Sequence, residues 1–412
     1  MHQKPFVILL AGGENSRFFP LNTGTHKGGR SIAGMSLINR CVADLYAHNF
    51  TNIRVVVSEK DYGGNGLSGS LEKPVEFVLQ PEPRGQADAI ILATADLEGD
   101  CIVASPYYLN AGAIAQQLLE KQESTQAECV VLASETTEPA LYGMLQLQED
   151  TLTGIVEKSE EQTNSNTKAN SFYYFNRSFL QQLAATEISQ YSLEQHLHQF
   201  AQGHNVKIVR TEKHWPSLKF AWQLLEFTDI ILSQQTSKRD PSAMIAATAI
   251  FDETKGAVVI AEGAVIKDFV TISGPAYIGK NVLIGEYSFI RGSSIEGDCK
   301  VGANTEIVRS LLLPEVTIHS GYCADSILGE KTTIGAGLIT ANLRLDGTQV
   351  HAMVAEKKRA TNKRKMGIIT GENVHLGVRV TTMPGTLIGA NSTIYPGLIV
   401  SHSIENDSIK KV

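Results

Sequence analysis

No apolar run in this sequence is long enough to cross a bilayer, which requires about 20 consecutive apolar residues. Hydrophobic residues nevertheless make up 42% of the chain, enough to fill a sizeable core. The first residues, Met1 to Lys4, lead directly into a strand-like run, so we expect no signal peptide. The sequence therefore indicates a cytoplasmic protein with no membrane segment.

Cysteine is scarce, and no two of the five cysteines have the spacing of metal ligands, so reduced thiols in a cytosolic protein are the simplest interpretation. An excess of basic residues is also lacking. The net charge of -7 argues against a nucleic-acid-binding protein. The five cysteines are Cys41, Cys101, Cys129, Cys299 and Cys323.

Aliphatic residues spaced six apart are abundant from about residue 260 onward, and this spacing slips by one residue between Ile290 and Ile295. A six-residue period fits neither a helix nor an ordinary strand. It is typical of hexapeptide repeats, in which each short side of a parallel β-helix points one aliphatic side chain inward. A β-sandwich with short strands is the alternative, but a six-residue spacing would rarely persist by chance over so many residues. The ladder consists of Ile260, Ile266, Ile272, Ile278, Ile284, Ile290, Ile295, Val301, Ile307, Leu313, Leu328, Ile334, Leu376, Thr382, Ile388, Ile394 and Val400.

Strand-like and helix-like segments alternate before the ladder, which predicts a mostly parallel sheet with helices on both faces. We expect a Rossmann-like α/β domain over residues 1–235, a linker over 236–250 and a β-helix over 251–412. A basic insertion at 341–366 interrupts the ladder. This insertion is either a solvated loop or a source of charge that neutralises phosphates of a ligand.

A glycine turn follows the first expected strand, at Leu10–Leu21. Such a turn brings backbone N–H groups against phosphates, and an arginine at its end can grip a triphosphate. The stretch resembles the L-A-x-G-x-G-x-R-x-x-P-L pattern of the sugar-1-phosphate nucleotidylyltransferases. The resemblance implies that Gly12 and Gly13 contact the nucleotide and that Arg17 stabilises the leaving pyrophosphate. Lys27, where the family has P-K-P, would contact phosphates of the nucleoside triphosphate and of the sugar 1-phosphate.

Further motifs of the same family follow in order over some two hundred residues. Residues 80–87 resemble Q-x-x-x-x-G-T-A, residues 142–143 match Y-G, and residues 157–158 match E-K. The resemblance implies base contacts from Gln80 and Gly85. It implies contacts near the sugar from Gly143, Glu157, Lys158 and Asn170.

Two departures concern the metal of this family. After the strand at residues 101–104 the family has G-D, whose aspartate holds Mg²⁺, but this chain has Ser105 and Pro106. The family's later W-x-D-x-G has Ser217 in place of the aspartate. Because Mg²⁺ usually takes one or two carboxylates beside phosphates, we assign no metal ligand, and a requirement for Mg²⁺ is in doubt. Nucleotidylyl transfer is therefore expected to be weak or absent, unless Asp88, Asp96 or Asp100 substitutes.

Residues 319–329 and 335–346 carry the strongest resemblance in the chain. They match H-L-x-Y-x-G-D-S-x-I-G and G-A-G-T-x-x-A-N-L-R-x-D of hexapeptide acyltransferases, especially the archaeal-type bifunctional enzymes that make UDP-N-acetylglucosamine. The resemblance implies a left-handed β-helix that forms homotrimers with active sites between neighbours.

The same resemblance implies that His319 is the general base that deprotonates a sugar amine attacking acetyl-CoA. Histidine is a common general base near neutral pH. Tyr322, Asn342 and Arg291 would lie around the sugar phosphate and the thioester. A histidine beside the ladder could otherwise be a solvated corner.

The motifs leave two functional hypotheses. The first is a transferase that acts on a sugar 1-phosphate with a nucleoside triphosphate, acetyl-CoA or both. The second is a non-catalytic subunit that binds sugar nucleotides and has kept the fold after losing the metal carboxylates.

Overall fold

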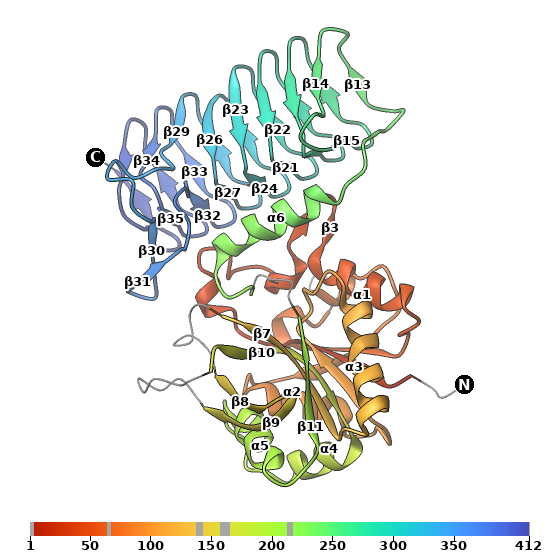
Figure 1. Cartoon of the computed structure of the whole chain (residues 1–412). Helices are drawn as coiled ribbons and strands as arrows, with labels where there is room; N and C mark the ends of the chain where they lie inside the picture. Colours follow the sequence, from red (N-terminus) through yellow and green to blue (C-terminus); the bar gives the residue numbers. More distant parts are fainter. Residues whose placement is uncertain (1–3, 64–66, 137–142, 157–164, 212–216, 412) are drawn as a thin grey trace. The chain divides into compact units, whose positions relative to one another are not determined.

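The computed structural model divides into two compact units (Figure 1). The first unit comprises Met1–Glu14 and Leu37–Trp215, and the second comprises Asn15–Ser36 and Pro216–Val412. The chain therefore joins the second unit for one short segment before it completes the first. The structure describes residues 4–63, 67–136, 143–156, 165–211 and 217–411.

The first unit is built on a nine-stranded sheet in the order β5-β4-β1-β6-β10-β7-β11-β9-β8. Strands β5, β4, β1 and β6 run parallel, whereas β10 runs antiparallel to β6 and β7. The strands are β1 (Phe6–Ala11), β4 (Ile53–Ser58), β5 (Glu76–Gln80), β6 (Cys101–Ala104), β7 (Cys129–Glu135), β8 (Met144–Gln148), β9 (Thr151–Val156), β10 (Thr167–Phe175) and β11 (Val206–Arg210).

Helices cover both faces of this sheet, as the alternating pattern predicts. Successive residues of β1 point to opposite faces. Ile8 lies in the hydrophobic cluster with Ile90 of α2, and Leu9 lies in the cluster with Ile38 of α1. The Rossmann-like expectation is confirmed. The helices are α1 (Leu37–Ala47), α2 (Gln86–Thr94), α3 (Ala111–Thr125), α4 (Arg177–Ala184) and α5 (Ser192–Ala201).

The second unit contains three parallel sheets that form the parallel β-helix that the ladder predicts (Figure 1), with the left hand that the family resemblance implies. Equivalent aliphatic residues stack from coil to coil, as where Ile278 pairs with Ile260 and Ile295. The ladder side chains fill the interior. Because each coil pairs only with its neighbours, stability accumulates coil by coil.

The first of these sheets contains β12 (Lys238–Arg239), β15 (Val258–Ile260), β18 (Ala276–Ile278), β21 (Ser294–Ile295), β24 (Leu311–Leu312), β27 (Ile327–Leu328), β32 (Ile369–Thr370) and β35 (Leu387–Ile388). The second contains β13 (Met244–Ile245), β16 (Val265–Ile266), β19 (Leu283–Ile284), β22 (Lys300–Val301), β25 (Thr317–Ile318), β28 (Thr333–Ile334), β33 (His375–Leu376), β36 (Thr393–Ile394) and β38 (Ile409–Lys410). The third contains β14 (Ile250–Asp252), β17 (Thr271–Ser273), β20 (Phe289–Arg291), β23 (Thr305–Val308), β26 (Gly321–Ala324), β29 (Leu338–Thr340), β34 (Thr381–Thr382) and β37 (Ile399–Val400).

Two details differ from the sequence-based expectation. Leu312, not Leu313, continues the ladder, because Leu312 pairs with Ile295 and lies in the interior cluster. The step from Ile307 is thus one residue shorter than six. In addition, β12 and β13 lie within the range expected to be a linker, and they already pair with β15 and β16.

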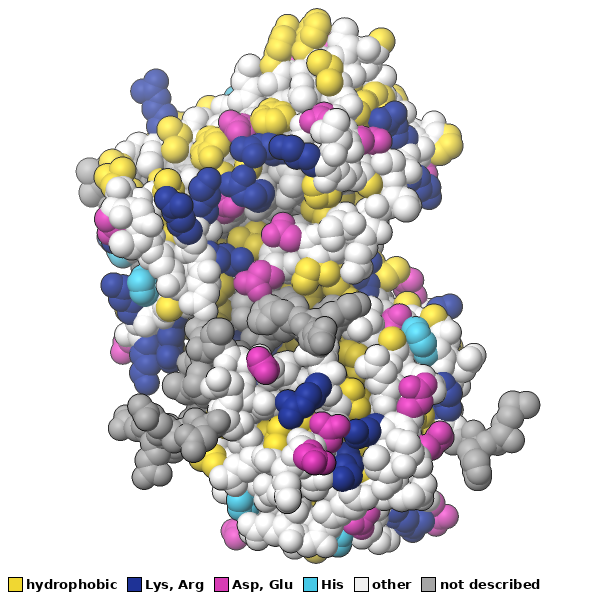
Figure 2. Space-filling model, viewed as in Figure 1, with side chains coloured by type: hydrophobic (Ala, Val, Ile, Leu, Met, Phe, Trp, Pro, Cys, Tyr) yellow, Lys and Arg dark blue, Asp and Glu magenta, His cyan; other side chains and the backbone are white. Residues whose placement is uncertain are grey.

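The insertion forms a hairpin of β30 (His351–Val354) and β31 (Lys357–Ala360). Lys and Arg side chains gather over this hairpin (Figure 2). Strand β27 pairs with β32 across the insertion, so the coil resumes in register. Helix α6 (Leu224–Ser233) lies beside the β-helix, and Lys363 of the insertion forms an ion pair of 3.2 Å with its Glu226. No described helix has the length and apolar character that a membrane crossing requires.

Candidate active site

The glycine turn of the first unit lies at the carboxyl end of β1, beside Gln80 at the end of β5. A Cβ atom added to Gly12 would lie 2.5 Å from Gln80 Oε1, so glycine permits this approach. Gln80 is buried, and its Nε2 donates to the carbonyl of Gly85 at 3.2 Å and to Asp88 at 2.8 Å. The structure thus brings Gly12, Gln80 and Gly85 together. Gly13 is exposed next to them.

The residues expected near the sugar are described in part. Asn170 lies where the pairing of β10 with β7 is irregular, and its Oδ1 accepts a hydrogen bond of 3.2 Å from Ser134. Gly143 immediately precedes β8, which pairs with β10. Glu157 and Lys158 lie outside the described residues.

The positions of the family's metal carboxylates hold no acidic group. Strand β6 ends at Ala104, and the following Ser105 donates its N–H to the carbonyl of Ser171 at 3.0 Å. Ser217, in the second unit, accepts a hydrogen bond of 3.0 Å from Gln223. Across the described residues, no group of three or more His, Cys, Asp or Glu side chains could hold a metal ion. The donor set therefore does not fit the family's Mg²⁺ site.

The three aspartates named as substitutes are engaged elsewhere. Asp88 accepts hydrogen bonds from Gln80 and Arg84. Asp96 forms a bidentate pair with Arg54 at 2.6 and 2.9 Å, and this arginine lowers the pKa of the carboxyl group.

Asp100 precedes β6 and accepts from the hydroxyl of Tyr174 and the backbone N–H of Arg177. Asp100 therefore lies at the amino end of β6, whereas Ser105 lies at its carboxyl end.

Arg17 and Lys27 both lie in the segment Asn15–Ser36 of the second unit. Arg17 is exposed on the 3₁₀ turn Ser16–Phe18. Asn15, which stands where the family has a glycine, adopts the left-handed conformation with a φ of 56°. Lys27 is partly buried. Burial and the positive charge of Arg17 lower the pKa of Lys27 to about 8. Two neighbouring cations suit an anionic phosphate group.

His319 lies on a groove of about 830 Å³ that runs along the β-helix. It occupies the corner between β25 and β26, where its side chain is exposed. The imidazole has no hydrogen-bond partner in the described part of the chain. Tyr322 borders the same groove, so the structure brings these two residues together. Aliphatic residues form much of the wall: Leu283, Val301, Ile318, Leu338 and Ile339.

Tyr322 belongs to an outward-facing column of the third sheet, between Glu306 and Ile339. Burial and the carboxylates of Glu306 and Asp325 raise the pKa of Tyr322, and the cations Arg309 and Arg291 partly oppose this. Charged groups of both signs therefore lie within electrostatic range of the phenol.

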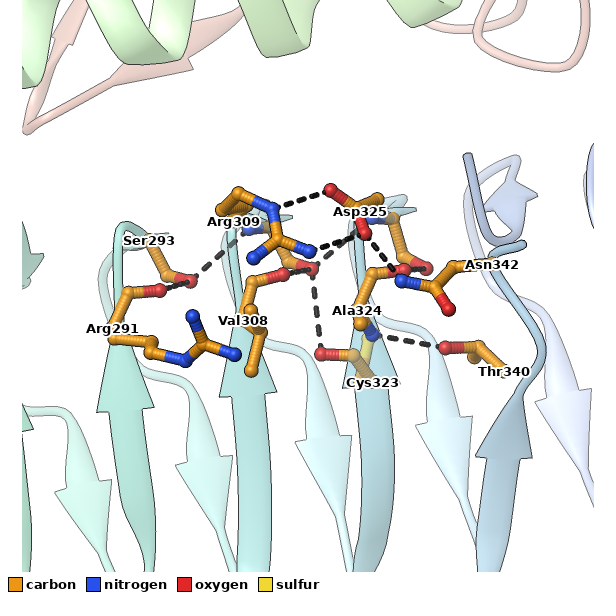
Figure 3. A network of polar contacts seen from close by, with 11 residues as sticks. Arg291, Ser293, Val308, Arg309, Cys323, Ala324, Asp325, Thr340 and Asn342 are labelled. Atoms are coloured by element: carbon orange, nitrogen blue, oxygen red, sulfur yellow. Dashed lines mark hydrogen bonds and ion pairs between the residues drawn. The ribbon is translucent and has the colours of Figure 1, made fainter. Parts of the chain in front are cut away.

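Asn342 lies in a polar network at the other edge of this sheet (Figure 3). Arg309 forms two hydrogen bonds to Asp325, at 2.6 and 2.7 Å, and the amide of Asn342 donates to the same carboxylate at 2.5 Å. The carbonyl of Arg291 joins this network, because it accepts from the hydroxyl of Ser293 at 2.8 Å and from the backbone N–H of Arg309 at 2.9 Å, whereas its guanidinium group has no drawn bond (Figure 3). Its Nε is buried and has no acceptor among the described residues.

Arg309 was not singled out from the sequence; it directly follows Val308, which pairs with Arg291 on the neighbouring coil. It lines a second cavity of about 320 Å³ with Asp325, Asp229 of α6 and the basic residues of the insertion, Lys363, Arg364 and Lys365. Burial raises the pKa of Asp229, and the charges of Lys363 and Arg309 oppose that shift.

Three family models match parts of this chain. Residues 6–223 match the nucleotidyl transferase family. Residues 257–292 match the bacterial transferase hexapeptide repeats, and residues 367–402 match the hexapeptide repeat of succinyl-transferase.

Curated relatives are similar over almost the whole chain. A bifunctional sugar-1-phosphate nucleotidylyltransferase/acetyltransferase of Sulfurisphaera tokodaii is 28% identical over 98% of this chain and 100% of its own length. The bifunctional protein GlmU of Methanococcus aeolicus is 27% identical and that of Methanocaldococcus jannaschii is 26% identical, each over 98% of this chain and 96% of the relative. Since the family model spans more than half of the chain, this protein belongs to the nucleotidyl transferase family, and a hexapeptide-repeat transferase domain follows in the same chain.

Proposed function

We propose that this protein is a transferase of nucleotide-sugar synthesis whose β-helix transfers an acetyl group from acetyl-CoA to the amine of an amino-sugar 1-phosphate. The observation that carries the proposal is the exposed, unbonded His319 beside Tyr322 on an apolar groove. The nearly full-length similarity to bifunctional nucleotidylyltransferase/acetyltransferases supports the substrate class.

The chemical step needs an unprotonated amine next to the thioester carbonyl. His319 takes a proton from the amine as its nitrogen attacks the carbonyl carbon, and the C–S bond then breaks. The proton passes to the departing thiolate, which leaves as CoA thiol. The aliphatic groove wall holds the CoA arm, while the guanidinium group of Arg291 attracts the phosphate of the sugar.

The ligands of the nucleotidyl transferase family region are a nucleoside triphosphate and a sugar 1-phosphate, and Arg17 and Lys27 bind phosphate groups of these ligands. Gln80 and Gly85 contact the base, and Gly12 and Gly13 approach the phosphates. Asn170 and Gly143 contact the sugar, and the family motif assigns the same role to Glu157 and Lys158. Transfer of the nucleotidyl group is slow, because no carboxylate stands where the family holds its metal.

Three copies of the chain assemble along the outward-facing column of the third sheet. This column runs from Ile250 through Phe289, Tyr322 and Ile339 to Ile399. Ile250, Ile339 and Ile399 are 59%, 51% and 70% exposed, and apolar exposure of this kind along one face marks an association surface. A neighbour seated there covers Tyr322 and completes the acetyl-transfer site.

The direct test is acetyl-CoA consumption with a panel of amino-sugar 1-phosphates, with parallel assays of pyrophosphate release from the four common nucleoside triphosphates. The expected result is acetyl transfer with at least one amino sugar and little pyrophosphate. Absence of both activities contradicts the proposal.

A non-catalytic sugar-nucleotide-binding subunit is the second candidate, favoured by Ser105, Pro106 and Ser217 at the metal positions. Nucleotide binding without either turnover would establish it.

A further inference from the structure

The segment Asn15–Ser36, which carries Arg17 and Lys27, is held on the β-helix by buried polar contacts. It ends in a hairpin of β2 (Ser31–Ile32) and β3 (Met35–Ser36), with Ala33 and Gly34 at the turn. Both turn residues adopt positive φ, 50° and 77°, so their successive N–H groups point the same way and form an anion-binding concavity.

The carboxylate of Glu296, which directly follows β21 of the β-helix, occupies this concavity. Ala33 N–H donates to Oε1 at 2.8 Å and Gly34 N–H donates to Oε2 at 3.0 Å. The hydroxyl of Ser294 adds a bond of 2.6 Å to Oε1. Glu296 is only 1% exposed, so water cannot replace these donors, and leaving a buried carboxylate without them is costly.

Arg30 makes a second anchor three residues after Lys27. Its NH1 donates to Glu330 of the β-helix at 2.9 Å, and its NH2 donates to the carbonyls of Leu21 and Thr23 at 3.0 and 2.8 Å. Arg30 is 1% exposed, whereas the side chain of Glu330 is 30% exposed. This arginine therefore fastens the segment to the β-helix and also closes the loop that contains Lys27.

The hairpin turn also packs closely against the β-helix, in addition to its hydrogen bonds. A Cβ atom on Gly34 would lie 2.3 Å from the hydroxyl oxygen of Tyr277 on β18, and the positive φ of Gly34 disfavours a side chain in any case. The turn and the sheet are thus shaped to each other.

We propose that Glu296 and Glu330 are positioning residues for nucleoside triphosphate binding, because they fix on the β-helix the segment that carries Arg17 and Lys27. This inference rests on the proposed function, in which these two cations bind phosphates. Triphosphate binding, attributed to the nucleotidyl transferase family region, then depends on side chains of the hexapeptide-repeat region.

The test uses the full chain with Glu296→Ala and Glu330→Gln. The matched control is Glu262→Ala, which removes an exposed β-helix carboxylate paired with Lys280. Each of the four common nucleoside triphosphates is titrated by calorimetry, and amide hydrogen exchange is followed over residues 15–36 and over the coils. We expect affinity to fall about tenfold or more in Glu296→Ala, as for other lost bonds to charged groups. A smaller fall is expected in Glu330→Gln, and wild-type behaviour in the control.

Exchange should quicken in residues 15–36 of Glu296→Ala, while the coils and acetyl transfer keep their wild-type behaviour. Burial lowers the pKa of Lys27, so the pH above which triphosphate binding weakens should also be higher in Glu296→Ala than in the wild type, as that lysine becomes solvated. Simple loss of stability would not move this pH.

Unchanged affinity in both variants overturns the inference, whether or not exchange has quickened. If Glu296→Ala does not fold, Glu330→Gln decides alone, because its carboxylate is partly exposed and its loss leaves the interior intact. A wild-type chain that binds no triphosphate refutes the nucleotide half of the proposed function, whereas wild-type binding that survives both substitutions refutes only the positioning role.

Discussion

The groove on the β-helix and the carboxyl end of β6 differ in whether they offer a side chain that is available for catalysis. On the groove, His319 is exposed and its imidazole has no hydrogen-bond partner within the described chain. At the end of β6, serine and proline stand where a metal carboxylate is expected, and Asp88, Asp96 and Asp100 are each engaged in other bonds. Acetyl transfer needs one available base, but nucleotidyl transfer needs charge neutralisation on several phosphates. Loss of two carboxylates can therefore silence one reaction and leave the other intact.

The strongest way to break this comparison is to remove the base. His319→Ala should lower acetyl transfer by about 100–10,000-fold, the usual effect of losing a general base. Because His319 is exposed, assembly and thermal stability should not change. His375→Ala, at another exposed histidine of the second sheet, is the control and should keep full activity. The measurement is thiol release from acetyl-CoA, and wild-type rates in His319→Ala would show that another group is the base.

Introducing the two absent metal carboxylates should raise nucleotidyl transfer and leave acetyl transfer unchanged. Pro106→Asp combined with Ser217→Asp should raise Mg²⁺-dependent pyrophosphate release by about 100-fold, since a bound metal contributes several kcal/mol to the transition state. Pro106→Asn with Ser217→Asn has similar shape without charge and should give no gain. An unmodified chain that already turns over at an ordinary enzymatic rate would mean that the missing pair is not needed.

Asp325 should matter for stability rather than for proton transfer, unlike His319. Asp325→Ala leaves Arg309 and Asn342 without their shared acceptor, and we expect a loss of about 2 kcal/mol, or roughly 30-fold in the folding equilibrium. The value is modest because the Arg309 side chain is 35% exposed. Asp298→Ala is the matched control, since Asp298 also has positive φ but is exposed. Urea unfolding measures both, and equal losses would assign the effect to the backbone.

The smallest expected effect concerns pH. The pKa of Lys27 is lowered to about 8, so its charge is present below pH 8 and is lost as pH rises above it. If this charge binds a triphosphate, affinity should fall by about tenfold between pH 8 and pH 9.5, because each pH unit above the pKa removes about nine-tenths of the charged form. Calorimetry at both pH values tests this. Lys27→Arg should stay charged and keep its affinity, and an equal decline in both proteins would exclude Lys27 as the cause.

The sequence was enough to predict the β-helix because its signal is local and repeated. Ile260 and Ile278 occupy equivalent positions, and every coil repeats the same requirement. The sequence could not show that Leu312 rather than Leu313 continues the ladder, because both residues are aliphatic and both are buried. Hydrophobicity cannot distinguish such neighbours, whereas pairing with Ile295 can.

The docking of residues 15–36 on the β-helix could not be predicted. Glu296 binds backbone N–H groups of Ala33 and Gly34, and any residue except proline offers that donor. The two partners are also more than 260 positions apart. Similarly, the sequence motif predicted that Asn342 belongs to the site. Only the structure shows that Asn342 donates to Asp325, at the edge of the sheet opposite His319.

The insertion at 341–366 leaves the β-helix undisturbed, because Ile327 pairs with Ile369 as if nothing intervened. In evolutionary terms the hairpin of β30 and β31 is an exchangeable cassette. A descendant can lengthen, shorten or recharge it without altering the number of coils or the phase of any later residue. Variation in length and charge among relatives should therefore concentrate in this hairpin. The coil residues on either side of it should keep their pairing with the neighbouring coils.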